Sequence, residues 1–280
     1  MKVTFTGVPQ PNKNEQKKNN YLQNAICLPI PQIVETAIGI PVGVACQDRI
    51  IKHANNSEIN KYLQKALDET NLKQTGLKIR AYKVEDNVNY LQKVFSLINA
   101  ETGASFGRNA GYNPILNTIL IPYKKLQGAI FHEMGHAMNK NFNPTLKALQ
   151  YLRPILTYSI LAIGTIGICT SSKQPPEDGE LSKKDKFKNF MHNNAGKLAF
   201  AVSTPILLEE FIATVKGNKL AAKVMPENLV KVVKKTNMYG GLCYLTSAAV
   251  GAIGISAGVK LKDYLVARKH EKMDKKALAE

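Results

Sequence analysis

His132-Glu133-Met134-Gly135-His136 repeats histidine at four-residue spacing around a glutamate. On an α-helix, residues four positions apart lie on one face, so the two imidazoles would point at a common centre. This H-E-x-x-H pattern is typical of a zinc site in which the glutamate takes a proton from a metal-bound water, whose pKa the ion lowers to roughly 7. The pentapeptide therefore predicts a metallopeptidase core, with Zn²⁺ as cofactor and Glu133 as the catalytic residue.

The residues around the pentapeptide predict one helix over 125–141. Apolar residues recur at helical spacing, and no proline occurs from Tyr123 to Phe142. Asn143-Pro144 ends the predicted helix. Gly135 costs about 1 kcal/mol relative to alanine inside a helix, so we expect another chain segment to pack closely at that turn.

A catalytic zinc ion needs a third protein ligand and leaves its fourth position to water. The apolar stretch 207–214 contains two adjacent carboxylates, Glu209 and Glu210. Charges in such surroundings are costly unless they are paired, and a cation nearby would explain them. Alternatively, both glutamates lie in water where a helix leaves an apolar layer. The spacing leaves open which glutamate would be the ligand.

About residues 100 to 220 resemble the membrane-bound zinc metalloproteases that include HtpX and the CAAX prenyl proteases. In that family a second helix carries an E-x-x-A-D motif whose glutamate is the third zinc ligand. Glu210-Phe211-Ile212-Ala213 matches the first four positions of this motif, and Thr214 stands in place of the aspartate. The resemblance implies a zincin-like unit with zinc held by His132, His136 and Glu210. It also implies that residues 107–122 include a substrate-side edge strand.

The same strand is predicted from its own residues. Ile115, Leu116, Ile119, Leu120 and Ile121 form a β-prone apolar set between Pro114 and Pro122. Such a strand at a sheet edge beside the metal could bind an extended peptide through main-chain hydrogen bonds. An ordinary edge strand without a ligand is the alternative.

Long apolar stretches predict a membrane protein. Nineteen consecutive uncharged residues run from Pro154 to Ser172, and a second uncharged run covers 236–259. The shorter stretch 198–208 would cross a membrane only together with 190–197, as a hairpin with the first span. Residues 25–46 contain Glu35 and three prolines, so we expect a broken or interfacial helix as readily as a span.

The charge distribution favours a cytoplasmic catalytic part. Residues 48–153 carry fifteen basic and eight acidic side chains, a net charge of +7. The tail after Val259 is also basic, however, and three spans would put it on the opposite side. The basic residues are dispersed and no recognised nucleic-acid module accompanies them, so we expect no nucleic-acid partner. All four cysteines lie in apolar segments, and no disulfide framework is predicted.

These observations predict an α+β, mainly helical fold, a zincin-like unit with transmembrane helices inserted between and after the metal-ligand helices. The expected segments are a disordered polar tail (1–24), an apolar segment (25–47), a catalytic part (48–153), a transmembrane hairpin (154–208), a third-ligand helix with an amphipathic helix (209–235), a transmembrane helix (236–259) and a basic tail (260–280).

The predicted function is that of a membrane-anchored zinc endopeptidase, with peptide or protein substrates and lipid as partners. Tyr112, His192 and Arg108 are candidate donors to the transition-state oxyanion. The alternatives are a catalytically inactive metalloprotease-like scaffold, a membrane protein without metal, and an intramembrane zinc protease. Lys124 and Lys125 argue against the last, because they lie too close to His132 for that helix to begin deep in hydrocarbon.

Overall fold

The computed structural model describes residues 21–84, 87–98, 100–170 and 180–279. In chain order its elements are α2 (Ile30–Val34), η1 (Glu35–Gly39), α3 (Ile40–Ala54), η2 (Ser57–Tyr62), α4 (Leu63–Thr70), η3 (Leu72–Thr75), β1 (Lys78–Tyr82), α5 (Tyr90–Ile98), α6 (Ala100–Ser105), β2 (Gly111–Asn113), β3 (Thr118–Pro122), η4 (Gln127–Ala129), α7 (Ile130–Phe142), α8 (Pro144–Cys169), α9 (Lys183–Val224) and α10 (Glu227–Ala277). The expected mainly helical class is confirmed. The expected tail 1–24 lies outside the described residues, apart from 21–24, which begin a helix.

Among the described residues, four helices are long and apolar enough to cross a membrane, which is consistent with an integral membrane protein. They are Tyr21–Ala54, which includes α2, η1 and α3, then Pro144–Cys169, Lys183–Val224 and Glu227–Lys276. Pro154 and Pro205 lie inside α8 and α9 without ending them. The helices are therefore longer than the apolar stretches in the sequence, and α9 and α10 continue across the segment limits expected at 208, 235 and 259.

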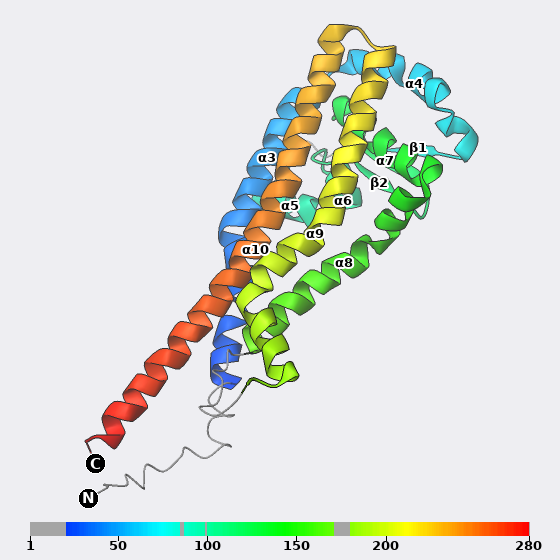
Figure 1. Cartoon of the computed structure of the whole chain (residues 1–280). Coiled ribbons are helices and arrows are strands. Elements are labelled where there is room, and N and C mark those ends of the chain that lie inside the picture. The colour runs from blue at the N-terminus through cyan, green and yellow to red at the C-terminus, as the bar shows by residue number, and fades with distance from the viewer. Residues whose placement is uncertain (1–20, 85–86, 99, 171–179, 280) are drawn as a thin grey trace, which may run out of the picture.

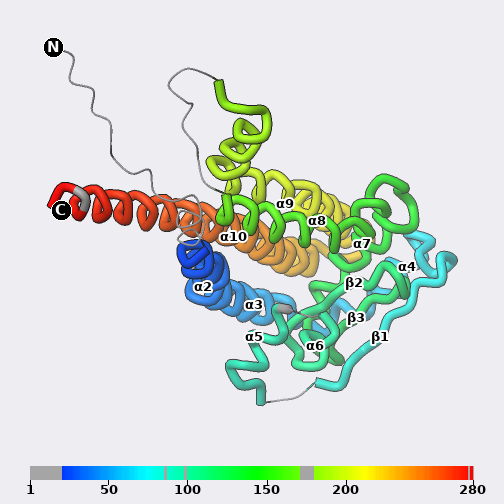
Figure 2. Tube along the Cα trace, turned by 90° about the horizontal axis from the view of Figure 1, so that it is seen from below, coloured from blue at the N-terminus to red at the C-terminus, as the bar shows by residue number. Residues whose placement is uncertain are grey.

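The long helices pack side by side, and the small sheet lies with α6 and α7 against one part of them (Figure 1). The C-terminal part of α10 extends beyond the other helices at the opposite end (Figures 1 and 2). The segment that connects α3 to α8 thus lies at one end of the bundle. The basic C-terminal tail lies at the other end. If the four helices cross a membrane, only one of these two basic regions can be cytoplasmic.

The helix limits follow from local capping. Asn143 ends α7 and caps α8, because its side chain accepts a hydrogen bond from the backbone N–H of Leu146 and Pro144 follows at the first helical position. Ser182 caps α9 in the same way through the N–H of Asp185. Helix α7 begins five residues later than the expected 125, since Leu126 has a left-handed backbone (φ 58°) and η4 follows it.

The sheet corrects the strand prediction. Its order is β1-β3-β2, with β3 parallel to β1 and antiparallel to β2, so β3 is the central strand and not an edge. Ile115 and Leu116 are outside the strand, and their side chains are 78 % and 63 % exposed. The Asn113 side chain accepts hydrogen bonds from the backbone N–H groups of both, which turns the chain between β2 and β3. The two edge strands of this sheet are therefore β1 and the short strand β2.

Candidate metal centre

Two glycines let α7 and α9 approach closely enough to share a site. A Cβ atom on Gly135 would lie 2.0 Å from the backbone oxygen of Ala213, and one on Gly217 would lie 2.3 Å from the backbone oxygen of Phe131. Any side chain at either position would push the helices apart. The close packing expected at Gly135 is thus confirmed, and the neighbouring segment is α9.

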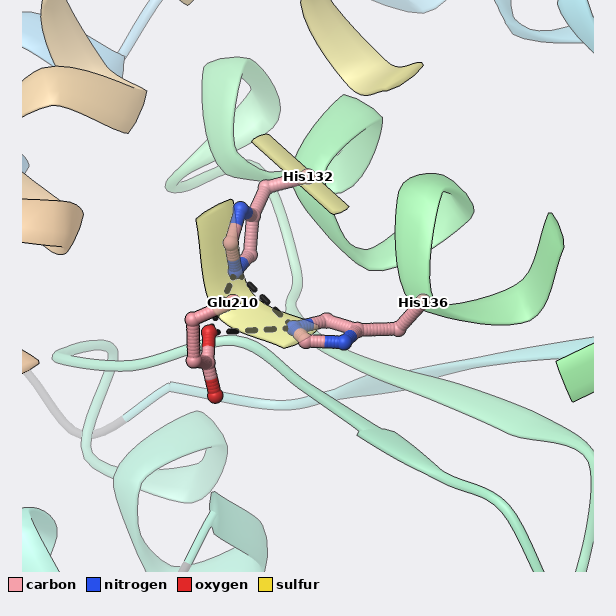
Figure 3. Close-up of side chains that lie close together, drawn as sticks. All are labelled: His132, His136 and Glu210. Carbon is pink, nitrogen blue, oxygen red and sulfur yellow. Dashed lines mark hydrogen bonds and ion pairs between the residues drawn. The ribbon is translucent and has the colours of Figure 1, made fainter. Parts of the chain in front are cut away.

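Across this contact, His132, His136 and Glu210 form a buried group that could hold a metal ion (Figure 3). Their facing atoms form a triangle. The two Nε2 atoms are 3.0 Å apart, and each lies 3.2 Å from Oε2 of Glu210. Zinc bonds of about 2.0–2.1 Å at tetrahedral angles would separate the ligand atoms by roughly 3.3 Å. The three side chains therefore fit around one ion of this size.

The outer nitrogens of both imidazoles have oxygen partners. Nδ1 of His132 lies 3.1 Å from Oγ1 of Thr214, and Nδ1 of His136 lies 2.9 Å from Oε1 of Glu209. An Nδ1–H that donates to such an oxygen leaves the lone pair on Nε2, which is the atom in the triangle. Thr214, which replaces the aspartate of the E-x-x-A-D motif, thus contacts a histidine of the group through its hydroxyl.

The two adjacent glutamates lie in different surroundings. Glu210 contributes Oε2 to the triangle, whereas Glu209 faces the outer side of His136. The Glu209 carboxylate also accepts hydrogen bonds from Nδ2 of Asn139 (2.9 Å) and Nε2 of Gln150 (2.7 Å). Glu209 is 3 % exposed, and these polar partners account for its burial. The geometry therefore brings Glu210, and not Glu209, into the metal-binding group.

Arg153 holds the other oxygen of Glu210. Its Nη2 atom lies 2.7 Å from Oε1, and its guanidinium carbon lies 5.5 Å from the centre of the Tyr244 ring. Arg153 directly precedes the uncharged stretch that begins at Pro154 and was not among the predicted site residues. Its position just before an uncharged stretch was the one sign in the sequence of a special role. The contact with Glu210 joins residues 57 positions apart, and no local pattern predicts it.

Glu133 is 6 % exposed and lies on α7 between the two histidines. Burial raises the pKa of its carboxyl group, and the neighbouring imidazoles act in the opposite direction. Burial lowers the pKa of His136, but the carboxylates of Glu210 and Glu209 outweigh this effect and hold that pKa well above the usual value. With both imidazoles neutral, as metal ligands are, three carboxylates against one guanidinium carry two negative charges, which a divalent cation would neutralise.

A cavity of about 410 Å³ opens beside this group. His132 and Glu133 line it, together with residues of the helix Tyr21–Ala54, of α5 and of α10. Asn109 and Ala110, immediately before the edge strand β2, also line it. The cavity therefore connects the metal-binding group both with the sheet edge and with the candidate membrane helices.

The three expected oxyanion donors are engaged elsewhere. The Tyr112 hydroxyl donates to Oδ1 of Asn117 (2.6 Å), and Arg108 pairs with Asp48 (2.6 Å). His192 lies between the backbone oxygen of Gly167 and Oδ1 of Asp263, 2.8 Å from each. None of the three is among the described residues that line the cavity. Tyr244, which sequence reasoning missed, lines the cavity and contacts Arg153.

No family model, curated protein or solved structure matches this chain.

Proposed function

We propose that this chain is a membrane-anchored zinc endopeptidase with its catalytic part on the cytoplasmic side. The observation that carries the proposal is the buried triangle of His132, His136 and Glu210, with Glu133 beside it at the wall of a cavity. Two imidazoles and one carboxylate are a common ligand set of catalytic zinc, and they leave one position open. The net charge of +7 over 48–153 supports the cytoplasmic side.

A zinc ion bound there would lower the pKa of a water molecule and polarise the scissile carbonyl group. Glu133 accepts a proton from the attacking water and later donates it to the leaving amine. The raised pKa of its carboxyl group suits both steps, because a group whose pKa lies closer to neutral pH can both accept and return the proton. Thr214 and Glu209 fix the two imidazole rings, and Arg153 fixes the Glu210 carboxylate.

The peptide substrate would add to the edge strand β2. Extended peptides commonly bind as an additional strand at a free sheet edge, and the chain just before β2 lines the cavity that contains Glu133. This position replaces the edge expected over residues 115–121, which the central place of β3 rules out. The zincin-like arrangement and the resemblance to HtpX and the CAAX prenyl proteases are part of the same proposal and are supported by the two motifs alone.

The test is the metal content of the detergent-purified protein by mass spectrometry. We expect about one zinc per chain in the wild type, loss of zinc in His136→Ala and Glu210→Ala, and retention in Glu227→Ala, a control at an 81 % exposed glutamate side chain of α10. A well-folded wild type without metal would contradict the proposal. Zinc-loaded wild type that cleaves no member of a peptide library, while Glu133→Gln keeps its zinc, would instead favour the inactive scaffold.

Glu210 and Arg153 also bear on the intramembrane alternative. Both belong to helices that could cross a membrane, whereas the two histidines belong to the part between α3 and α8. The metal-binding group thus lies where the candidate spans meet that part. We favour an anchored protease with its site at this junction. The depth of the site in the membrane distinguishes this anchored protease from an intramembrane protease.

A further inference from the structure

Helix α5 presents large apolar side chains to its surroundings. Tyr90, Leu91 and Phe95 are 56 %, 67 % and 56 % exposed. Leu91 and Phe95 are four residues apart and therefore neighbours on one helix face. A helix on the surface of a protein in water normally turns such a face toward the core.

One polar side chain of α5, that of Ser96, faces the protein instead. Ser96 is fully buried, its hydroxyl donates to Oε1 of Gln47 (2.9 Å), and Nε2 of Gln47 donates to the Ser96 backbone oxygen (3.3 Å). Lys93 pairs with Asp48 closer to the surface, with its Nζ atom 3.8 Å from Oδ2, and the two side chains are 31 % and 49 % exposed. Helix α5 thus buries a serine while large apolar side chains remain on its outer side, which indicates an apolar medium there.

The neighbour of α5 is a helix that could cross a membrane. Both views show α5 beside α3 (Figures 1 and 2). Leu97 packs against Gly43 of α3, where a Cβ atom would lie 3.2 Å from both Leu97 methyl carbons. The same helical segment, Tyr21–Ala54, exposes Ile33 (55 %) and Ile38 (49 %). The apolar face of α5 therefore lies next to a helix that could cross a membrane and that itself exposes apolar side chains.

We propose that α5 is an interfacial helix whose face of Tyr90, Leu91 and Phe95 lies in the lipid bilayer. The proposal rests on the four long helices crossing the membrane and not on peptidase activity. Amphipathic helices bury such faces at the boundary between headgroups and acyl chains, and tyrosine is enriched at that depth. A second protein copy fits less well, because nine residues present a strip of roughly 13 by 10 Å, whereas stable interfaces bury about 1,200–2,000 Å².

This placement gives α5 two sides with different roles. Val94 and Leu97 line the cavity that contains His132 and Glu133, while Leu91 and Phe95 contact lipid. The helix is then the wall between that cavity and the bilayer. The metal-binding group accordingly lies close to the depth of the membrane surface, where a membrane-bound chain could reach it.

The chain contains no tryptophan, so a single Trp substitution reports its own depth. We would reconstitute Leu91→Trp and Phe95→Trp separately into phosphatidylcholine vesicles and compare quenching by brominated lipid with quenching by aqueous acrylamide. Ile253→Trp, at a 59 % exposed position of α10, is the control for a membrane helix. Ile115→Trp, at the 78 % exposed turn between β2 and β3, is the control for water.

We expect brominated lipid to quench both α5 variants several-fold more than Ile115→Trp, most strongly when the bromines are near the headgroups, with weak quenching by acrylamide. Acrylamide quenching equal to that of Ile115→Trp would overturn the proposal. Protection from both quenchers would also overturn it, since α5 would then be covered by protein. Agreement between Leu91→Trp and Phe95→Trp, each monodisperse in detergent, excludes local misfolding as the cause. Zinc content and peptide cleavage are read separately and do not affect these outcomes.

Discussion

Gly135 of α7 lies directly against the main chain of Ala213 of α9, where a Cβ atom would be only 2.0 Å from the Ala213 carbonyl oxygen. This contact determines the separation of the two helices that provide His132, His136 and Glu210. A backbone atom cannot turn away as the end of a flexible side chain can. The metal-binding group therefore depends on the absence of a side chain at this position.

We expect Gly135→Ala to destabilise the protein by about 1–3 kcal/mol, the usual cost of overpacking, and to reduce zinc content because α7 moves away from Glu210. The midpoint of thermal unfolding in detergent and the zinc content measure the two effects. Gly251→Ala in α10 is the matched control, since its Cβ would meet nothing within 4 Å. That substitution should leave zinc unchanged and stabilise the helix by up to about 1 kcal/mol. Equal behaviour of the two variants would show that α7 and α9 do not pack as described.

The two glutamates should differ in how their loss affects metal binding. Glu209→Gln keeps an oxygen that can accept from the outer nitrogen of His136, so we expect full zinc stoichiometry with affinity weakened by about 10–100-fold. Glu210→Gln should lose stoichiometric zinc. Competition with a chromophoric chelator measures the zinc affinity and stoichiometry of both variants. Stoichiometric loss in Glu209→Gln with retention in Glu210→Gln would reverse the assignment.

Thr214 should affect the zinc affinity of the site through its contact with His132. Thr214→Val keeps the shape of the side chain but removes the oxygen 3.1 Å from Nδ1, so we expect zinc affinity to fall by about tenfold. Thr214→Ser should retain most of the affinity because it retains the hydroxyl. Thr204→Val, at an exposed threonine of the same helix, controls for the loss of a hydroxyl in α9. Unchanged affinity in Thr214→Val would remove the threonine from any role at the metal.

The features that the sequence predicted well are those with a local cause. The helix around the pentapeptide follows from apolar spacing, and its end follows from Asn143-Pro144. The adjacent charges Glu209 and Glu210 were informative because they interrupt an apolar stretch. Their separate surroundings depend on partners such as Gln150, 59 positions away, and no local pattern encodes that contact.

The strand prediction was confirmed for Ile119, Leu120 and Ile121, and it was wrong for Ile115, Leu116 and the edge position for a physical reason. Ile115 and Leu116 are as apolar as the strand residues that follow, but the Asn113 side chain captures their backbone N–H groups in a turn. The position of β3 between two partners then depends on β1, about 40 residues earlier in the chain. The helices that could cross a membrane are longer than expected, because α9 and α10 continue through charged residues at which the apolar segments were expected to end.

Cys46 of α3 and Cys243 of α10 provide a test of the helix packing that forms the cavity. The two thiols face each other across the contact between α3 and α10, and Cys243 lines the cavity. Both cysteines are free. Oxidation by copper phenanthroline, which takes up two electrons as the two thiols release two protons, should join them in a disulfide.

We expect a maleimide reagent to titrate two thiols fewer in the oxidised, denatured protein, and proteolytic fragments containing Cys46 and Cys243 to separate only after reduction. Cys46→Ser should abolish the link while Cys27 and Cys169 still react. The link should form with or without zinc, because neither cysteine belongs to the metal-binding group. If oxidation instead joins two different chains through Cys169, which is exposed, and leaves Cys46 and Cys243 reduced, then α3 and α10 do not pack as described and the cavity loses one wall.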